Sequence, residues 1–160
     1  RYFNPIGAHE SGLIGEKPKD FPRNILPLLN KVAAGQIKEF KNFGKDWDPI
    51  DGTGIRDYIH VMDLAEGHIL SLEFLMNNDS QFINLNLGTG IGTSVLELVK
   101  TFEKINNVQV PFVFSKRREG DVAHLVADNS LAISILNWKP MKNLEDMCSD
   151  GWRWQRNNIK

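Results

Sequence analysis

The sequence is poor in cysteine, in net charge and in long apolar runs. Cys148 is the single cysteine among 160 residues, so an internal disulfide and a thiolate metal cluster are both excluded. The net charge of -1 provides no field that would attract nucleic acid or an anionic membrane. No apolar run approaches the ~20 residues of a membrane span, and no signal-like segment opens the chain. We therefore expect a cytoplasmic protein with neither a nucleic-acid partner nor a membrane partner.

The composition that remains is typical of a globular domain. Hydrophobic residues make up 41% of the chain and charged residues 24%, close to the averages of folded proteins. The four histidines are scattered without metal-ligand spacing, so we expect no metal site. The chain begins at Arg1, without Met, and leads directly into an apolar segment. We expect a piece of a longer protein, with residues 1–160 forming one domain.

The pattern of apolar and turn residues predicts a small mixed α/β domain. Strands are predicted over residues 1–5, 39–43, 81–87 and 110–114. Pro5 should end the first strand because it lacks an N–H group. Helices are predicted from Pro22 to Gly35, from near Asp63, after Ser94, after a cap at Asp128, and from Asn143 to residues 151–154. Ser94 with Glu97 matches a capping box, and residues 47–54 have the composition of a turn.

Residues 88–92, Gly-Thr-Gly-Ile-Gly, lie between a predicted strand and a predicted helix, where a dinucleotide fingerprint would stand. Their spacing differs from that fingerprint, since Thr93 occupies the place of the third glycine. The next strand is followed by Lys116 and Arg117, without the acidic residue that binds a ribose of NAD, although basic residues would fit an NADP site. A tight turn is the favoured interpretation.

Two arginines from distant segments stand beside glycines. Arg56 follows Gly52 and Gly54, and Arg118 precedes Gly120. A guanidinium is a planar fork of donors that suits phosphate oxygens, and glycine lets the backbone approach a ligand closely. A single arginine in a loop is usually a solvated surface charge, but this pair favours a clamp for a pyrophosphate.

The residues next to Arg56 contain the side chains of an acid–base cluster, namely Asp57, Tyr58, His60 and Asp63. Tyr58 and His60 fall on one face of a short strand, and Asp63 enters or caps the next helix. Orientation and packing explain these residues, so we assign no catalytic role to them.

Residues 1–5 read Arg-Tyr-Phe-Asn-Pro, residues 52–63 read Gly-Thr-Gly-Ile-Arg-Asp-Tyr-Ile-His-Val-Met-Asp, and residues 117–121 read Arg-Arg-Glu-Gly-Asp. Together these segments resemble the sugar-nucleotide half of the UDP-glucose 4-epimerases, in the extended short-chain dehydrogenase/reductase superfamily. The resemblance runs from Arg1 to about Gln155. It implies a small mixed α/β substrate-binding domain that follows a Rossmann NAD-binding domain.

The resemblance also implies roles for individual residues. Arg56 and Arg118 match the arginines that hold the UDP diphosphate, and Asp121 matches an acceptor for a ribose hydroxyl. Further substrate contacts are implied for Asn4, for Asn24 and Ile25 at a helix start near the diphosphate, and for Lys41, Asn42 and Phe43 in the strand that frames uracil. Phe3 corresponds to a backbone contact with the nicotinamide end of NAD. Arg117 matches no family role and is expected to be solvated.

Leu125 corresponds to a position beside the C2 substituent of the sugar, where some epimerases carry a Tyr. Leu is smaller than Tyr and has no hydroxyl. The resemblance therefore implies that the complete enzyme also accepts UDP-N-acetylglucosamine, less well than UDP-glucose.

The catalytic Tyr-x-x-x-Lys pair and the glycine-rich NAD fingerprint of the family belong to the preceding Rossmann domain. No Tyr of this chain is followed by Lys at that spacing, so we expect no catalytic residue here and no turnover by this chain alone. The complete enzyme would interconvert UDP-glucose and UDP-galactose with NAD, bound mainly by the missing domain. A homodimer, if one forms, would pair through that domain.

Two alternatives stay open. One is a different enzyme of the extended superfamily, such as a UDP-glucuronate epimerase or a sugar-nucleotide dehydratase. The other is a nucleotide-sugar-binding module without catalysis. An upstream Rossmann sequence in the encoding gene would separate the enzymes from the module.

Overall fold

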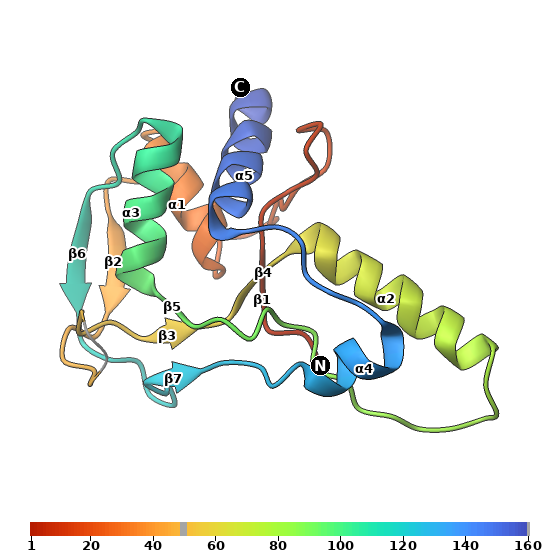
Figure 1. The fold of residues 1–160 in the computed structure, drawn as a ribbon. Helices are drawn as coiled ribbons and strands as arrows, with labels where there is room; N and C mark the ends of the chain where they lie inside the picture. The colour runs from red at the N-terminus through yellow and green to blue at the C-terminus, as the bar shows by residue number, and fades with distance from the viewer. Residues whose placement is uncertain (49–50, 160) are drawn as a thin grey trace.

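The computed structural model describes residues 1–48 and 51–159, and it confirms the predicted mixed α/β domain (Figure 1). The helices are α1 (Ile25–Ala33), α2 (Val61–Met76), α3 (Val95–Asn106), α4 (Ser130–Leu136) and α5 (Leu144–Asn158). The strands are β1 (Asn4–Ile6), β2 (Phe40–Phe43), β3 (Ile55–Arg56), β4 (Tyr58–His60), β5 (Thr93–Ser94), β6 (Phe112–Ser115) and β7 (His124–Leu125). Residues 49 and 50, inside the predicted turn over residues 47–54, lie outside the described residues. Across the described ranges, no helix has the length and apolar character that crossing a membrane requires.

The strands are short and form three small sheets. β1 pairs in parallel with β4, β2 pairs in parallel with β6, and β3 lies between β5 and β7. Asp57 alone separates β3 from β4, so the chain passes directly from one sheet into the next (Figure 1). Residues of β1, β2, β3 and β4 share the lining of one pocket, which is the candidate site described below.

Three helices, α1, α3 and α5, surround the main core beside β2 and β6 (Figure 1). Their apolar positions recur at helical spacing, so each helix buries one face. Phe102 of α3 and Trp152 of α5 meet edge to face, with ring centroids 5.9 Å apart. The buried members of this core are Ile6, Leu26, Leu29, Val32, Phe40, Tyr58, Leu98, Val99, Phe102, Val110, Met147, Cys148 and Trp152.

The helix boundaries confirm several local predictions. Gly35 follows α1 with a φ of +70°, the left-handed conformation in which helices commonly end. The Oγ of Ser94 accepts from the Glu97 N–H at 2.9 Å, and the Glu97 carboxylate accepts from the Ser94 N–H at 3.4 Å, which is the predicted capping box. Asn143 opens α5 through the same reciprocal arrangement with Asp146, with both distances at 2.9 Å.

A smaller core lies between α2 and α4. The buried indole of Trp138 donates to the C=O of Asp63 at 3.0 Å, and the Asp63 carboxylate accepts from the Lys142 N–H at 2.9 Å. These bonds tie the segment between α4 and α5 to the first turn of α2. The other buried members are Ile59, Leu64, Leu85, Leu87, Ala132 and Leu136.

Pro5 lies inside β1 and does not end it, so this prediction was wrong. The N–H of Asn4 donates toward β4, to the C=O of Asp57, whereas the N–H of Phe3 donates to the C=O of Leu87 on the opposite side. Backbone N–H groups alternate between the two sides of a strand, so the nitrogen of Pro5 faces the same side as that of Phe3, toward Leu87. On that side the pairing consists of one bridge, between Tyr2 and Leu87, and does not reach Pro5. No ladder bond therefore requires an N–H at Pro5.

The strand predicted over residues 81–87 was also wrong, because this segment has only one bridge, between Leu87 and Tyr2. Its partner there is confined to residues 1–3, which is too short for a ladder. Two boundaries also moved by two residues: α2 begins at Val61, because His60 caps it, and β6 begins at Phe112.

The last two helices differ from their predicted ends as well. Asn129 occupies the cap position of α4, although the Asp128 carboxylate does accept the Ser130 N–H at 3.1 Å. α5 continues to Asn158 and does not stop at residues 151–154. Gly151 lies inside this helix, where any side chain would collide with Leu26 of α1, so the glycine marks a contact between helices and not a helix end.

Candidate functional site

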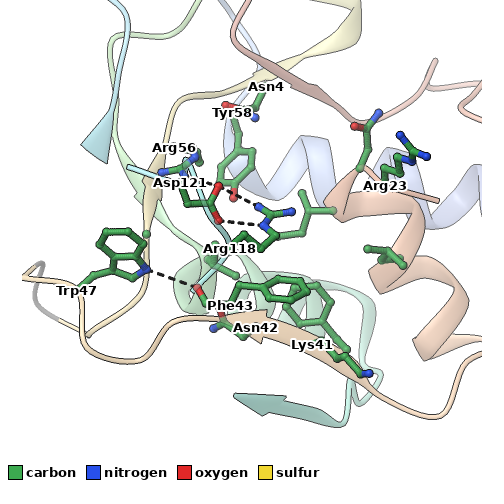
Figure 2. A pocket seen from close by; sticks show the side chains of 16 residues that line it. Asn4, Arg23, Lys41, Asn42, Phe43, Trp47, Arg56, Tyr58, Arg118 and Asp121 are labelled. Carbon is green, nitrogen blue, oxygen red and sulfur yellow. Dashed lines mark hydrogen bonds and ion pairs between the residues drawn. The ribbon is translucent and has the colours of Figure 1, made fainter. Parts of the chain in front are cut away.

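One pocket gathers most of the predicted substrate residues (Figure 2). Nine of the ten line it, namely Asn4, Asn24, Ile25, Lys41, Asn42, Phe43, Arg56, Arg118 and Asp121. The tenth, Leu125, lies in β7 outside the lining, where it pairs with Arg56. Phe3 also lies outside the lining, and its N–H donates to the C=O of Leu87 at 3.2 Å. The ligand contacts assigned to all of these residues stay predictions.

Arg56 and Arg118 point at the same carboxylate (Figure 2). The Nε and Nη2 of Arg118 donate to Asp121 at 2.9 and 3.3 Å, and the Nη2 of Arg56 lies 3.7 Å from Asp121 Oδ1. Arg56 is also held by the C=O groups of Ile55 and Val122, which accept from its Nη1 at 2.8 and 2.9 Å. Its side chain is 17% exposed, against 57% for Arg118. The three charged groups sum to one positive charge, so this part of the pocket favours an anion.

The outer edge of β2 presents backbone groups to the same pocket. The N–H groups of Phe40 and Gly44 donate to carbonyl groups of the neighbouring β6 segment, at 2.8 and 2.9 Å. Since backbone groups alternate along a strand, those of Lys41 and Phe43 point to the opposite edge, which lines the pocket. This edge offers in-plane donors and acceptors to a planar base. The guanidinium of Arg118 lies over the Phe43 ring, 4.8 Å from its centroid.

Two buried polar side chains complete this wall. Tyr58 of β4 lies beside Asn4 of β1 and is almost fully buried. Burial raises the pKa of the Tyr58 phenol well above its usual value, so the phenol stays protonated and neutral. The amide of Asn42 is 3% exposed, and its Nδ2 has no hydrogen-bond partner in the part of the chain that the structure describes. A buried amide without a hydrogen-bond partner lowers the stability of the fold, and a hydrogen bond to a ligand would remove that penalty.

The start of α1 forms another wall. The Asn24 side chain donates to Glu16 Oε1 at 2.7 Å and does not cap the helix. The first turn of α1 carries no acidic residue, so no side chain of the helix itself neutralises the positive end of its dipole. Arg23, directly before Asn24, adds a guanidinium to the same rim (Figure 2). This wall therefore extends the region that favours negative charge.

The glycine-rich loop over residues 88–92 binds a carboxylate of the protein itself. Asp57 is fully buried and accepts from the N–H and the hydroxyl of Thr89 at 2.8 and 2.7 Å. It also accepts from the N–H groups of Gly90 at 2.9 Å and Ala127 at 3.2 Å. A nucleotide phosphate would need these loop N–H groups. The loop is therefore the tight turn that the sequence favoured, and it is not a dinucleotide cradle.

His60 is a helix cap. Its Nδ1 accepts from the Met62 N–H at 3.1 Å, so the proton of the neutral ring lies on Nε2, which faces Asp150 Oδ2 at 3.3 Å. Burial lowers the pKa of His60 by more than the neighbouring Asp150 raises it. The neutral imidazole opens α2 and ties it to α5. Among the residues that the structure describes, no group of three or more His, Cys, Asp or Glu could hold a metal ion.

Sequence reasoning did not assign several other lining residues to the site, among them Arg23, Trp47 and Tyr58. Tyr58 was explained by orientation and packing, although its position two residues after Arg56 in an extended segment places both side chains on one side. That spacing was a usable signal. Arg23 and Trp47 gave none, because the course of their loops decides where they lie. Arg117 is exposed, as expected of a solvated side chain, but its guanidinium also stacks on Trp47, which the sequence did not predict.

Comparisons with known proteins agree on one group of enzymes. A family model described as GDP-mannose 4,6 dehydratase matches residues 1–151. The UDP-glucose 4-epimerase of Bacillus subtilis is 50% identical over 159 residues, which are 99% of this chain and 47% of that protein. The crystal structure of UDP-glucose-4-epimerase from Stenotrophomonas maltophila with bound NAD and formylated UDP-arabinopyranose has a TM-score of 0.94 and 53% identity, over 98% of this chain and 46% of that one. The crystal structure of UDP-glucose 4-epimerase from Bifidobacterium longum in complex with NAD+ and UDP has a TM-score of 0.94 and 47% identity. This match covers 99% of this chain and 47% of that one. The chain spans about half the length of the curated relatives it matches.

Proposed function

This chain belongs to the GDP-mannose 4,6 dehydratase family of the extended short-chain dehydrogenase/reductase superfamily, and we propose that it is the UDP-sugar-binding part of an NAD-dependent UDP-glucose 4-epimerase. The proposal rests mainly on the pocket in which Arg56 and Arg118 meet beside the free edge of β2. Similar proteins named UDP-glucose 4-epimerase support it. In this proposal residues 1–160 form a single C-terminal domain of a cytoplasmic enzyme, in line with the free, buried thiol of Cys148.

The diphosphate of UDP would bind between the two guanidinium groups. It carries more charge than the Asp121 carboxylate and offers oxygens at the spacing of a guanidinium fork. It would therefore draw the exposed Arg118 away from Asp121, while Arg56 stays fixed by its bonds to the backbone of Ile55 and Val122. Asp121 would then be free to accept a hydroxyl of the ribose.

The uracil would lie along the outer edge of β2. Its O2, N3–H and O4 present an acceptor, a donor and an acceptor in one plane. The Lys41 N–H, the Lys41 C=O and the Phe43 N–H present the complementary order along that edge. The amide of Asn42 would find its missing partner on a ligand or an ordered water in the filled pocket.

The division of labour with NAD follows from what the described residues offer. When bound, NAD supplies the removal and return of the C4 hydride. The glycine-rich loop over residues 88–92, whose N–H groups a phosphate would need, already serves Asp57. The family resemblance assigns to this chain a single NAD contact, through the backbone of Phe3. We therefore assign NAD mainly to an upstream Rossmann domain, and to this chain the binding and orientation of the sugar nucleotide.

The exposed face of α2 is where we place that Rossmann domain. Apolar side chains recur along α2 at spacings of three and four residues and face solvent, namely Met62, Ala65, Ile69, Leu72 and Met76. Ile69, Leu72 and Met76 are 58%, 60% and 76% exposed. A stripe of this kind normally packs against another element. Because α2 stands at the margin of the domain (Figure 1) and the relatives are about twice as long, we propose their remaining half as its occupant. A homodimer would pair through that half.

The direct test joins this chain to the N-terminal half of the Bacillus subtilis relative and follows the conversion of UDP-galactose into UDP-glucose with NAD. We expect turnover by the joined protein and none by the purified chain. Epimerisation by the chain alone would contradict the division of labour. UDP binding by the joined protein without any turnover would instead favour a nucleotide-sugar-binding module.

The clamp is tested separately by titration calorimetry of the purified chain with UDP. Arg56→Ala and Arg118→Ala should each weaken binding by about 1.5 to 3 kcal/mol, because each removes charge-assisted hydrogen bonds to phosphate. Arg156→Ala, an exposed arginine in the last turn of α5, is the matched control and should bind as the parent does. Unchanged affinity in both pocket variants would show that the clamp is assigned wrongly.

A further inference from the structure

The chain directly after β2 folds back and places Trp47 at one end of the pocket. The indole N–H of Trp47 donates to the C=O of Phe43 at 3.4 Å, and Figure 2 shows the ring standing beside the end of the strand. Gly44 permits this close return. Its φ is +87°, and a side chain at Gly44 would collide with the indole. The half-buried indole lines the same pocket as Lys41 and Phe43.

Arg117 fixes the indole of Trp47. Its guanidinium lies 3.9 Å from the ring centroid, and its Nε donates to the Asp46 carboxylate at 2.9 Å. The hydrogen bond from Arg117 lowers the pKa of Asp46, because it favours the charged form of this carboxylate. Because Asp46 directly precedes Trp47, one guanidinium holds both the ring and the chain that carries it. The next residue, Arg118, lies over Phe43, so two consecutive arginines stack on two aromatic side chains of the pocket.

We infer that Trp47 selects the base of the bound nucleotide and that Arg117 is its positioning residue. This inference rests on the proposed binding of UDP. From Lys41 to Phe43 the strand rises about 7 Å, which is enough for the edge of one six-membered ring. The indole stands at the Phe43 end of that edge. A purine, whose fused second ring extends further, would run into it.

Trp47 also changes the hydrogen bonds that the edge offers. Because the C=O of Phe43 already accepts from the indole, an exocyclic amino group such as that of adenine or cytosine would have to share this acceptor with Trp47. The groups that remain are the N–H and C=O of Lys41 and the N–H of Phe43. They match the edge of uracil. The size of the ring and the order of donors and acceptors therefore both favour uracil over the other bases.

The experiment compares UDP with ADP, which carry the same ribose and diphosphate and differ only in the base. Titration calorimetry of the purified chain should give tighter binding of UDP. In Trp47→Ala the ratio of the Kd of ADP to the Kd of UDP should fall by about tenfold or more, partly because ADP binds more tightly. Steric exclusion in a binding pocket typically discriminates between ligands by a factor of this size. Trp47→Phe, which keeps a ring but loses the indole N–H, should narrow the ratio less.

The role of Arg117 is tested by a double-mutant cycle. Arg117→Ala should narrow the same ratio, and adding it to Trp47→Ala should produce little further change, because Arg117 acts through Trp47. Arg156→Ala should leave the ratio unchanged. Circular dichroism checks that each variant is folded. If Trp47→Ala is not, Trp47→Leu provides the same comparison with an apolar side chain.

The outcomes separate this inference from the proposed function. If the parent chain binds no UDP, the proposed function fails and takes the inference with it. If the parent prefers UDP and the folded Trp47 variants keep the same ratio, or lose both ligands equally, only the role of Trp47 is overturned. Independent and additive effects of Arg117→Ala and Trp47→Ala would overturn the positioning role of Arg117.

Discussion

Replacing Asp57 by asparagine tests how the fold aligns the two halves of the pocket. Asp57 lies between β3 and β4 and is fully buried. Its Oδ1 accepts from the N–H and hydroxyl of Thr89, and its Oδ2 accepts from the N–H groups of Gly90 and Ala127. Asp57→Asn keeps the size of the side chain. It replaces one accepting oxygen by an NH2 group that only donates.

The loss of stability can be estimated for the more favourable of the two orientations of the new amide. With its NH2 group at the Oδ1 position, the Thr89 hydroxyl can rotate to accept, so only the Thr89 N–H loses its partner. A buried N–H without an acceptor costs about 1 to 3 kcal/mol. The bonds from Gly90 and Ala127 also lose the help of the negative charge, at about 1 kcal/mol each. We therefore expect the free energy of unfolding to fall by about 3 to 5 kcal/mol.

Urea unfolding followed by circular dichroism measures this loss. Asp128→Asn is a matched control, because Asp128 also accepts from an N–H and a hydroxyl, those of Ser130, but it lies at the surface. Its loss should stay below about 1 kcal/mol. A loss below about 1 kcal/mol for Asp57→Asn, or an equal loss in the two variants, would refute the reasoning that the buried carboxylate organises this junction.

Three further predictions concern other parts of the chain. Burial lowers the pKa of His60 below its usual 6.5, so the unfolded chain takes up that proton first as the pH falls. The contribution of His60 to stability should thus be complete above about pH 6.5 and decline below it by at most about 1.4 kcal/mol per pH unit; urea unfolding at several pH values should show a shallower decline for His60→Gln. Ser94→Ala removes the cap of α3 and should lower the free energy of unfolding by about 1 kcal/mol, whereas an unchanged urea midpoint would mean that the cap is dispensable. In the joined enzyme, steady-state kinetics should show turnover of UDP-N-acetylglucosamine that Leu125→Tyr reduces; no turnover, or no effect of Leu125→Tyr, would remove Leu125 from the gate.

The structural features that the sequence predicted well are those that one segment decides by itself. The capping box of Ser94 and Glu97 and the start of α5 at Asn143 depend on neighbours three residues away, so their geometry follows from local chemistry. The turn over residues 88–92 was recognised from its glycine spacing. The gathering of nine substrate residues in one pocket came from the family resemblance and not from any local pattern.

The features that the sequence did not predict depend on contacts between distant segments. Asp57 acts on Thr89 and Ala127, which lie 32 and 70 residues further along the chain. Trp47 and Arg117 meet only because β2 and β6 pair and bring the ends of the two strands together. Gly151 suggested a helix end by composition, while its actual reason is the approach of Leu26 from another helix. Composition and spacing carry no information about such neighbours.

Asp121 explains how a pocket with two facing arginines remains stable before an anion enters it. Two guanidinium groups directed at one cavity repel each other, and that repulsion would oppose folding. Asp121 lies within reach of both, so it supplies a counter-charge from the wall of the pocket itself. In the proposed complex the diphosphate takes over this neutralising role, and the released carboxylate faces the ribose. The diphosphate clamp and the ribose contact are then coupled, because the binding of one frees the acceptor that the other requires.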